Sequence, residues 1–209
     1  MWLTALLIIA YLIGSIPTSI IAGKLLRGID IRDYGSRNPG ATNTFRVLGK
    51  KIGITVGLID IFKGFFCAFF LPALLPSESL VPEDVRHLMA GFAAISGHIW
   101  TVFAGFKGGK GVGTSFGVFL GLAPLPSLIT LALWCLLTFG TGYVSLGSIA
   151  GAVVLPAAVI IEGFVRDKLS LPICITAAVI GIIVIVRHRT NISKLLRGEE
   201  NHFGKRGKE

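Results

Sequence analysis

The sequence predicts an all-α fold: a polytopic integral membrane protein with seven transmembrane helices in a single domain, residues 1–209. Two features of the composition support this fold class. Hydrophobic residues make up 53% of the chain and charged residues only 15%, whereas a soluble domain carries about a quarter charged residues. The hydrophobic residues also form runs that match the length of a membrane-spanning helix, about 20 residues.

The charge distribution is a third observation. The net charge is +9, and the basic residues lie in the connections between the hydrophobic runs. This pattern fits the positive-inside rule and anionic ligands better than nucleic acid, so we expect no nucleic-acid partner. Cys67, Cys135 and Cys174 lie in hydrophobic stretches without paired spacing, which indicates buried side chains and implies neither a disulfide nor a zinc site.

The first predicted span covers residues 2–22. No basic residue precedes it, unlike in a signal peptide, so we expect a retained span with its N-terminus outside. The segment from Gly14 to Pro17 should kink the helix, which is tolerated when neighbouring groups satisfy the freed backbone. The next connection, residues 24–51, carries seven Lys and Arg residues against two Asp and should be cytoplasmic.

The second predicted span, residues 52–75, is interrupted by two ionisable residues. Asp60 and Lys63 lie three residues apart and can neutralise each other on one helix face, so we assign them a supporting role. The connection that follows, residues 76–86, holds three acidic residues against one Arg and should lie outside. It leads into the third span, residues 87–106.

The third span contains His98, for which we expect a hydrogen bond to a backbone carbonyl of a neighbouring helix rather than catalysis. Residues 112–139 then form a hydrophobic run that is too long for one span and contains Pro124. Two crossings that turn near Pro124 place the basic C-terminal tail inside, as the positive-inside rule prefers. The first of them, Val112–Ala123, is short for a bilayer and is predicted to be a short or partly re-entrant helix.

The last two predicted spans cover residues 143–161 and 171–186, and the tail from Arg187 onward is cytoplasmic. In this topology sixteen of the twenty Lys and Arg residues lie inside. We find no sequence repeat and no soluble domain.

Ten residues from Gly105 to Thr114, here called the glycine–lysine loop, contain five glycines and two lysines between hydrophobic runs. Glycine lets backbone N–H groups turn toward an anion, and Val112 should begin a helix whose positive end faces the same point. We therefore predict a phosphate site at a membrane surface, with Lys107 adding charge. The other residues expected to bind phosphate are Gly108, Gly109, Lys110, Gly111 and Thr114.

Two alternatives to this interpretation were weighed. The loop is a poor nucleotide P-loop, because Gly111 stands where Ser or Thr should bind magnesium and Ala104 replaces the leading glycine. A flexible turn whose lysines serve only as topology signals is the simpler structural alternative.

Residues 35–46, here called the first polar segment, are a second candidate anion site. Small residues, amides and hydroxyls can approach a phosphate closely, and Arg46 can bind two of its oxygens at once. As an alternative, Asn38, Pro39 and Gly40 are also an ordinary turn sequence. The residues expected to bind substrate are Ser36, Asn38, Gly40, Thr42, Asn43 and Arg46.

The third candidate segment combines the start of the sixth span with the end of the seventh. Ser145 and Ser148 share one helix face, and His188 and Asn191 have the same spacing of three. Arg187 joins this set, with snorkelling to lipid headgroups as the alternative. We expect all three segments to meet at the inner leaflet. The inner side has no cluster of carboxylates for magnesium, which argues against metal-dependent phosphotransfer.

Together these segments resemble the bacterial acyl-phosphate:glycerol-3-phosphate acyltransferase family. The resemblance spans nearly the whole chain and rests on Ser36–Asn43 with Arg46, Gly97–His98, Phe106–Val112, Ser145–Ser148, and Arg187–His188 with Asn191. Two positions depart from the family. Gly113 stands where Ala is expected before Thr114, and Arg37 stands where the family usually has glycine.

The resemblance implies a multi-pass enzyme of the bacterial inner membrane whose active site faces the cytoplasm. It would transfer a fatty acyl group from acyl phosphate to the 1-hydroxyl of glycerol 3-phosphate, giving lysophosphatidate and phosphate, the first step of phospholipid synthesis. It implies no cofactor and no metal, and we expect a monomer in the lipid bilayer. The residues expected to be catalytic are Ser36, Arg46, Lys107, Ser145, His188 and Asn191.

Two other functions were considered. A transporter of phosphorylated solutes would need charged groups near the bilayer midplane and usually a paired repeat, whereas here the charges gather at one surface. A non-enzymatic lipid-binding protein would tolerate Lys→Gln changes in the glycine–lysine loop.

Overall fold

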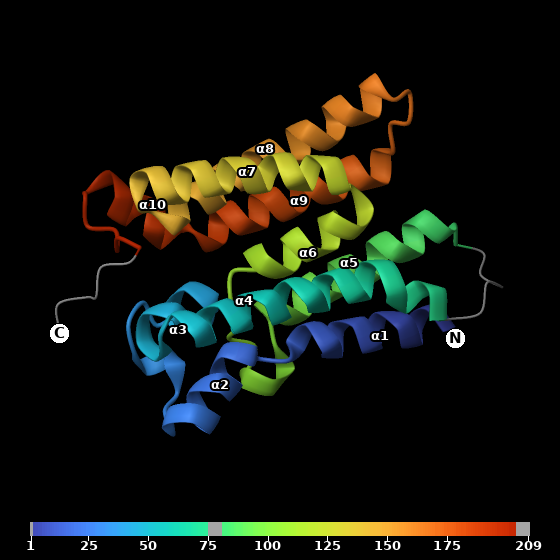
Figure 1. Ribbon diagram of the computed structural model, residues 1–209. Helices are drawn as coiled ribbons and strands as arrows, with labels where there is room; N and C mark the ends of the chain where they lie inside the picture. Colours follow the sequence, from blue (N-terminus) through green and yellow to red (C-terminus); the bar gives the residue numbers. More distant parts are fainter. Residues whose placement is uncertain (1, 75–80, 204–209) are drawn as a thin grey trace. The chain divides into compact units, whose positions relative to one another are not determined.

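The computed structural model describes residues 2–74 and 81–203, and within these ranges the chain is helical and contains no β-strand (Figure 1). This confirms the all-α prediction for the described residues. The chain divides into two compact units, Met1–Leu122 and Ala123–Glu209. The outer connection predicted at residues 76–86 lies partly outside the described residues.

The described residues of the first unit form six α-helices. α1 packs against α5, and α4 packs against both α6 and α3. The approach is closest where glycines face backbone: a Cβ on Gly14 would lie 2.1 Å from the Ala94 carbonyl oxygen. The helices are α1 (Trp2–Ser15), α2 (Thr18–Arg27), α3 (Ala41–Leu48), α4 (Lys50–Phe65), α5 (Glu83–Ile99) and α6 (Val112–Leu122).

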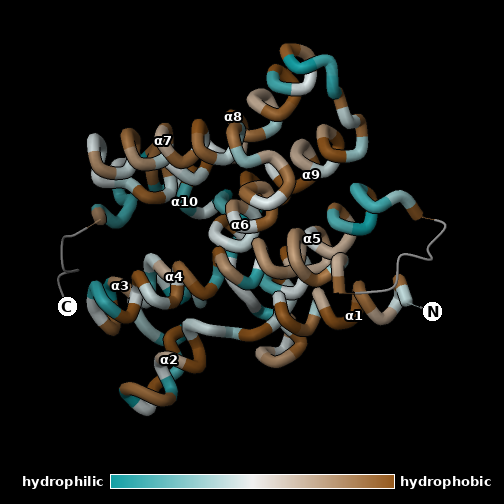
Figure 2. Tube along the Cα trace, turned by 45° about the vertical axis from the view of Figure 1, so that its right-hand side comes forward, coloured by the Kyte–Doolittle hydropathy of each residue, from teal (hydrophilic) through white to brown (hydrophobic). Residues whose placement is uncertain are grey.

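Four shorter elements complete the first unit. Three are single 3₁₀ turns, η1 (Ile31–Asp33), η3 (Leu71–Leu74) and η4 (Val102–Ala104). The fourth is the π-helical segment η2 (Phe66–Phe70), which continues α4. Figure 2 shows hydrophobic residues along α1 and α5 and hydrophilic residues on α3 and at the N-terminal end of α5.

The second unit contains four helices. α8 packs against α7 on one side and α9 on the other, and α10 contacts both α8 and α9. The helices are α7 (Pro124–Thr141), α8 (Val144–Val165), α9 (Leu171–Arg187) and α10 (Arg189–Leu196).

Several of these helices are long and apolar enough to cross a membrane. By length and composition the described residues hold five such segments: Trp2–Arg27, Lys50–Leu74, Glu83–Ala104, Pro124–Thr141 and Val144–Val165. The pair α9 and α10, bent by 57°, makes a sixth if it is one span. α6 has only 11 residues, short of the roughly 20 that a bilayer needs. The count of seven spans and the sides on which the termini lie stay predictions.

The predicted breaks fall where expected. α1 ends at Ser15 and α2 begins at Thr18, so Pro17 does interrupt the first helix. α6 ends at Leu122 and α7 begins at Pro124, which confirms the division of the long hydrophobic run.

Candidate functional site

The first polar segment is organised by one buried amide. Asn43 is 1% exposed; its Nδ2 donates to the Ile31 and Tyr34 carbonyls at 3.1 and 3.0 Å, and its Oδ1 accepts from Ser36 N at 2.8 Å. A Cβ on Gly35 would lie 2.3 Å from the same Oδ1. Because these backbone groups engage both its donor and its acceptor, Asn43 shapes the loop that presents Ser36.

Arg37, one of the two departures from the family resemblance, has a strained backbone conformation. Arg37 has a φ of 60°, in the left-handed region where only glycine escapes a steric cost. The glycine that the family resemblance leads us to expect here would adopt this conformation without strain, whereas Arg37 adopts it at a steric cost. Ser36 and Arg37 are both exposed at this turn.

The end of the first polar segment is helical, which the sequence analysis did not predict. α3 begins at Ala41, and in its first turn the Thr44 hydroxyl donates to the Gly40 carbonyl at 3.1 Å. The helix places Thr42 on its first turn and Arg46 on its last, both half-buried. Asn38 and Gly40 lie in the turn before it, and a Cβ on Gly40 would lie 2.9 Å from Asn38 Nδ2.

The glycine–lysine loop leaves Lys107 exposed and buries three of its five glycines. Lys107 is exposed and Lys110 is half-buried, whereas Gly108, Gly109 and Gly111 are buried. Gly111 has a φ of 86°, which favours glycine. α6 starts directly afterwards at Val112, as predicted, so its first N–H groups end at this loop.

The N–H groups of Gly108 and Gly109, which were predicted to bind an anion, donate instead to backbone carbonyls at the end of α5. Gly109 N donates to the His98 carbonyl at 3.2 Å and Gly108 N to the Ile99 carbonyl at 3.1 Å. A Cβ on Gly108 would lie 2.0 Å from the His98 oxygen, and one on Gly109 would lie 2.3 Å from His98 Nε2. The expectation that these N–H groups turn toward a ligand is therefore wrong, because they dock the loop onto the end of α5.

Thr114 was predicted to bind phosphate, but its side chain is fully buried. Within the described residues its hydroxyl has no hydrogen-bond partner. Its carbonyl lies against α4, where a Cβ on Gly64 would come within 2.2 Å of it. Thr114 thus belongs to the close contact between α4 and α6.

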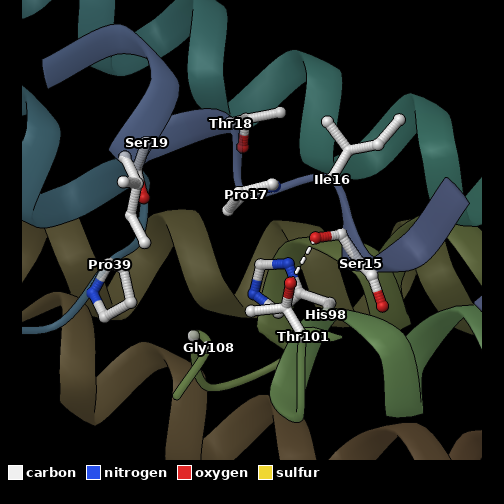
Figure 3. A pocket seen from close by; sticks show the side chains of 11 residues that line it. Ser15, Ile16, Pro17, Thr18, Ser19, Pro39, His98, Thr101 and Gly108 are labelled. Atoms are coloured by element: carbon white, nitrogen blue, oxygen red, sulfur yellow. Dashed lines mark hydrogen bonds between the residues drawn. The ribbon is translucent and has the colours of Figure 1, made fainter. Parts of the chain in front are cut away.

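The two polar segments of the first unit lie side by side. The Pro39 carbonyl oxygen lies 3.1 Å from the Cβ position of Gly109, and Arg32 Nη1 donates to the Ala104 carbonyl at 3.1 Å. Pro39 and Gly109 also line a small pocket beside the break between α1 and α2. His98 and Thr101 line the same pocket, and Figure 3 shows them apart from Pro39. The pocket has room for about one water molecule, so it is too small for glycerol phosphate.

A buried polar cluster lies beside this pocket. The Asp60 carboxylate accepts from the Thr18 hydroxyl at 2.8 Å and pairs with Lys63 at 2.9 Å. His98 Nδ1 lies 3.6 Å from the same Asp60 oxygen. The predicted pairing of Asp60 with Lys63 is confirmed. The predicted side-chain partner of His98 was wrong, since the imidazole faces a carboxylate and not a backbone carbonyl.

In the second unit a carboxylate that was not among the predicted site residues joins two that were. Ser145 Oγ and Asn191 Nδ2 both donate to Glu200 Oε1, at 2.9 and 2.7 Å. Ser148 has a different environment: its hydroxyl donates to the Val144 carbonyl and accepts from Trp134 Nε1. The available sequence signal for Glu200 was a pair of acidic residues in an otherwise basic tail.

The tail is held over the start of α8. Phe203 N donates to the Gly142 carbonyl at 2.6 Å, and the His202 ring lies against Tyr143. These contacts fix Glu200 beside Ser145. The tail residues 204–209 lie outside the described residues.

His188 sits at the bend between α9 and α10. It is 3% exposed, and its Nδ1 lies 2.8 Å from the Val184 carbonyl oxygen. Nδ1 must therefore carry the proton, and in the neutral ring Nε2 is the acceptor. Arg187 directly precedes it and is half-buried.

The structure thus joins the first polar segment to the glycine–lysine loop in the first unit, and Ser145 to Asn191 in the second. That all three segments form one site stays a prediction.

Known proteins resemble this chain along nearly its whole length. The family model for glycerol-3-phosphate acyltransferase matches residues 4–198. A glycerol-3-phosphate acyltransferase of Chlorobaculum tepidum is 44% identical, with 97% of each chain covered, and one of Chlorobium phaeobacteroides strain BS1 is 43% identical, with 95% of each covered.

Solved structures show the same similarity. A crystal structure of PlsY, an integral membrane glycerol 3-phosphate acyltransferase, in its glycerol 3-phosphate form is 38% identical with a TM-score of 0.84. The match covers 97% of this chain and 96% of that chain. The lysophosphatidic acid form of PlsY gives a TM-score of 0.80, covering 97% and 95%.

Proposed function

Since the chain belongs to the glycerol-3-phosphate acyltransferase family, we propose that it transfers a fatty acyl group from acyl phosphate to the 1-hydroxyl of glycerol 3-phosphate. The products are lysophosphatidate and inorganic phosphate. The observation that carries this proposal is the contact between two polar segments far apart in the sequence, beside the exposed Lys107 in the loop that leads into α6. Both substrates carry phosphate, which such a surface can bind.

The reaction needs few groups from the protein. Acyl phosphate is a mixed anhydride, so its acyl carbon is already activated and its leaving group is phosphate. The glycerol hydroxyl oxygen attacks that carbon, the bond from carbon to the phosphate oxygen breaks, and the hydroxyl proton passes to a phosphate oxygen. Proximity of the two bound substrates supplies much of the acceleration.

The polar residues of the first unit are assigned to the negatively charged phosphates of the substrates. Lys107 and Lys110 stabilise the negative charge on the phosphates as the acyl–oxygen bond breaks. Ser36 and Arg46 hold one phosphate, because a guanidinium can bind two of its oxygens in one plane. The conformation of this segment depends on Asn43, whose Oδ1 accepts a hydrogen bond from the Ser36 backbone N–H.

In the second unit, Ser145, His188 and Asn191 orient glycerol phosphate. Glu200 holds Ser145 Oγ and Asn191 Nδ2 in place by accepting from both. The Val184 carbonyl similarly fixes the His188 ring through Nδ1. We assign His188 to orientation and not to proton removal.

The protein acts as a monomer in the bacterial inner membrane, with seven spans and the reaction on the cytoplasmic face. To test this topology, the native cysteines of the protein are replaced and a single cysteine is introduced at Lys107. The variant is then labelled in spheroplasts. A membrane-impermeant thiol reagent should label it only after the membrane is opened; labelling of sealed spheroplasts would contradict the topology.

The activity is tested with purified protein in detergent, acyl phosphate and glycerol 3-phosphate. Phosphate should appear together with lysophosphatidate, and neither should form when one substrate is omitted. An acyl thioester should not replace acyl phosphate. Product from the thioester alone would overturn the donor assignment, and absence of any acylated product would overturn the proposed activity.

The role of His188 needs a separate experiment. His188→Gln keeps a polar group near the Nε2 position but has no basic nitrogen, so it should retain part of the turnover. His188→Ala should raise the KM for glycerol 3-phosphate. If His188→Ala abolishes turnover while both substrates bind normally, the imidazole is the base and our assignment is wrong.

A further inference from the structure

The turn that leads to Lys107 is held in an unfavourable backbone conformation. Gly105 and Phe106 follow each other in the left-handed region, with φ values of 64° and 60°. For Phe106 this conformation carries a steric cost, and its side chain is 59% exposed, so burial offers little compensation. The Thr101 carbonyl accepts from Phe106 N at 2.8 Å, and contacts from outside the turn add to this stabilisation.

The Ala104 carbonyl oxygen connects this turn to the segment between α2 and α3. The Ala104 oxygen accepts from Lys107 N at 3.4 Å, and it also accepts from Arg32 Nη1 at 3.1 Å. Arg32 and the backbone of Lys107 thus share one acceptor. The position of this oxygen decides where the Lys107 backbone, and so its side chain, begins.

Arg32 is itself held rigidly by Asp30. Its Nε donates to Asp30 Oδ1 at 3.0 Å and its Nη2 to Oδ2 at 2.7 Å, a bidentate pair, while Arg32 N donates to Oδ1 at 3.0 Å. The hydrogen bond from the Arg32 side chain lowers the pKa of the Asp30 carboxyl to about 2. The pair therefore remains ionised at any pH used for enzyme assays. Because a guanidinium is planar, this pairing fixes the direction of Nη1 toward Ala104.

We propose that Arg32 is a positioning residue that acts on substrate through Lys107: by holding the Ala104 carbonyl, it stabilises the turn from which Lys107 extends. This inference rests on the proposed phosphate-binding role of Lys107. Arg32 also lies four residues before Ser36, on the segment that Asn43 anchors at Ile31. The hydrogen bond from Arg32 to the Ala104 carbonyl therefore also holds the Ser36 loop in place relative to the glycine–lysine loop.

The first experiment compares the full-length protein with Arg32→Ala and Arg32→Lys. Loss of the charged hydrogen bonds should lower kcat/KM for glycerol 3-phosphate about 10- to 100-fold in Arg32→Ala. Arg32→Lys should recover only part of this, because an ammonium cannot reproduce the fork. Arg166→Ala is the matched control: Arg166 is exposed and pairs with Glu162 at 3.0 Å. Its kcat/KM should stay within about twofold of wild type.

A double-mutant cycle separates positioning from a general loss of structure. If Arg32 acts through Lys107, Arg32→Ala should change the residual kcat/KM of Lys107→Ala by no more than about twofold. A full-size effect of Arg32→Ala in the Lys107→Ala protein would overturn the proposal. If Arg32→Ala does not fold, the same cycle is measured with Arg32→Gln, which lacks the guanidinium and so loses the bidentate pair with Asp30 that directs the donor to Ala104.

A second readout does not depend on enzymatic activity. Trypsin cleaves after exposed lysines, so release of the turn should speed cleavage after Lys107 several-fold in Arg32→Ala relative to Arg166→Ala. Unchanged cleavage, or unchanged kcat/KM in an active protein, would show that Arg32 does not position the turn. If cleavage is faster in Arg32→Ala but the wild-type protein acylates nothing, the proposed function is refuted while the contact between Arg32 and the turn stands.

Discussion

The Lys63 ammonium donates a 3.1 Å hydrogen bond to the Ile16 carbonyl oxygen, at the point where Pro17 breaks the first helix. The same nitrogen lies 2.9 Å from Asp60 Oδ1, and both side chains are only 5% exposed. One buried cation therefore satisfies a carbonyl at the helix break and balances a carboxylate. This is the compensation that a broken membrane helix requires.

Removing Lys63 alone should be far more harmful than removing the pair. Lys63→Met leaves Asp60 charged and buried, which should cost about 3–5 kcal/mol of unfolding free energy. In the double variant Asp60→Asn, Lys63→Met no unpaired charge remains, so the loss should be smaller. Thermal unfolding of the purified proteins in detergent measures both. Equal losses in the single and double variants would contradict this account.

Two glycines of the glycine–lysine loop should respond differently to alanine. In Gly109→Ala the new Cβ would lie 2.3 Å from His98 Nε2, and overpacking of this kind costs about 1–3 kcal/mol. The loop must shift, and a shift near 1 Å at a reacting group can lower the rate about 100-fold. Initial rates of phosphate release measure the effect.

Gly113→Ala is the control for that change, because it lies in the same segment. Its Cβ would make an ordinary 3.5 Å contact with Asp60 Cβ, and alanine stabilises a helix by about 0.5–1 kcal/mol relative to glycine. Activity should be retained and thermal stability should rise. If Gly113→Ala were as damaging as Gly109→Ala, steric contact with His98 would not be the cause.

Glu200 should affect the affinity for glycerol 3-phosphate although it lies in the tail. Glu200→Ala leaves Ser145 and Asn191 without their shared acceptor, so we expect kcat/KM for glycerol 3-phosphate to fall about tenfold, mainly through KM. Glu200→Gln retains an acceptor oxygen and should lose less. The neighbouring Glu199, exposed and paired with Arg197 at 2.8 Å, provides the control. A Glu199→Ala variant with the same defect would argue against a specific role for Glu200.

Arg37→Gly should stabilise the protein. The left-handed φ of Arg37 is costly for any residue with a Cβ, so glycine should raise the unfolding free energy by about 0.5–1 kcal/mol after its greater freedom in the unfolded chain is counted. Lys24→Gly provides the opposite control, because Lys24 lies inside α2 and glycine there costs about 1 kcal/mol. Thermal unfolding of Arg37→Gly and Lys24→Gly in the same detergent, without added denaturant, allows the two variants to be compared. Destabilisation by Arg37→Gly would mean that the Arg37 side chain contributes more than its backbone costs.

Local signals in the sequence predicted several elements correctly. Pro17 and Pro124 interrupt helices because proline cannot continue the backbone hydrogen bonding of the preceding turn, and the structure breaks at both. The spacing of three between Asp60 and Lys63 places them on one helix face in any α-helix, so their pairing followed from position alone. The start of α6 at Val112 was also predicted, since it follows directly after the last tight glycine turn.

The sequence by itself therefore determined the helical fold, the helix breaks and the identity of the polar segments, because each depends on residues a few positions apart. Only the tertiary structure decided which groups contact one another. Asn43 accepts from the backbone of its own loop, Gly108 and Gly109 donate to the end of α5, and Glu200 accepts from Ser145. Arg32 and Ala104 are 72 residues apart. A hydrogen bond over that distance in sequence depends on how the helices pack, and no local pattern encodes it.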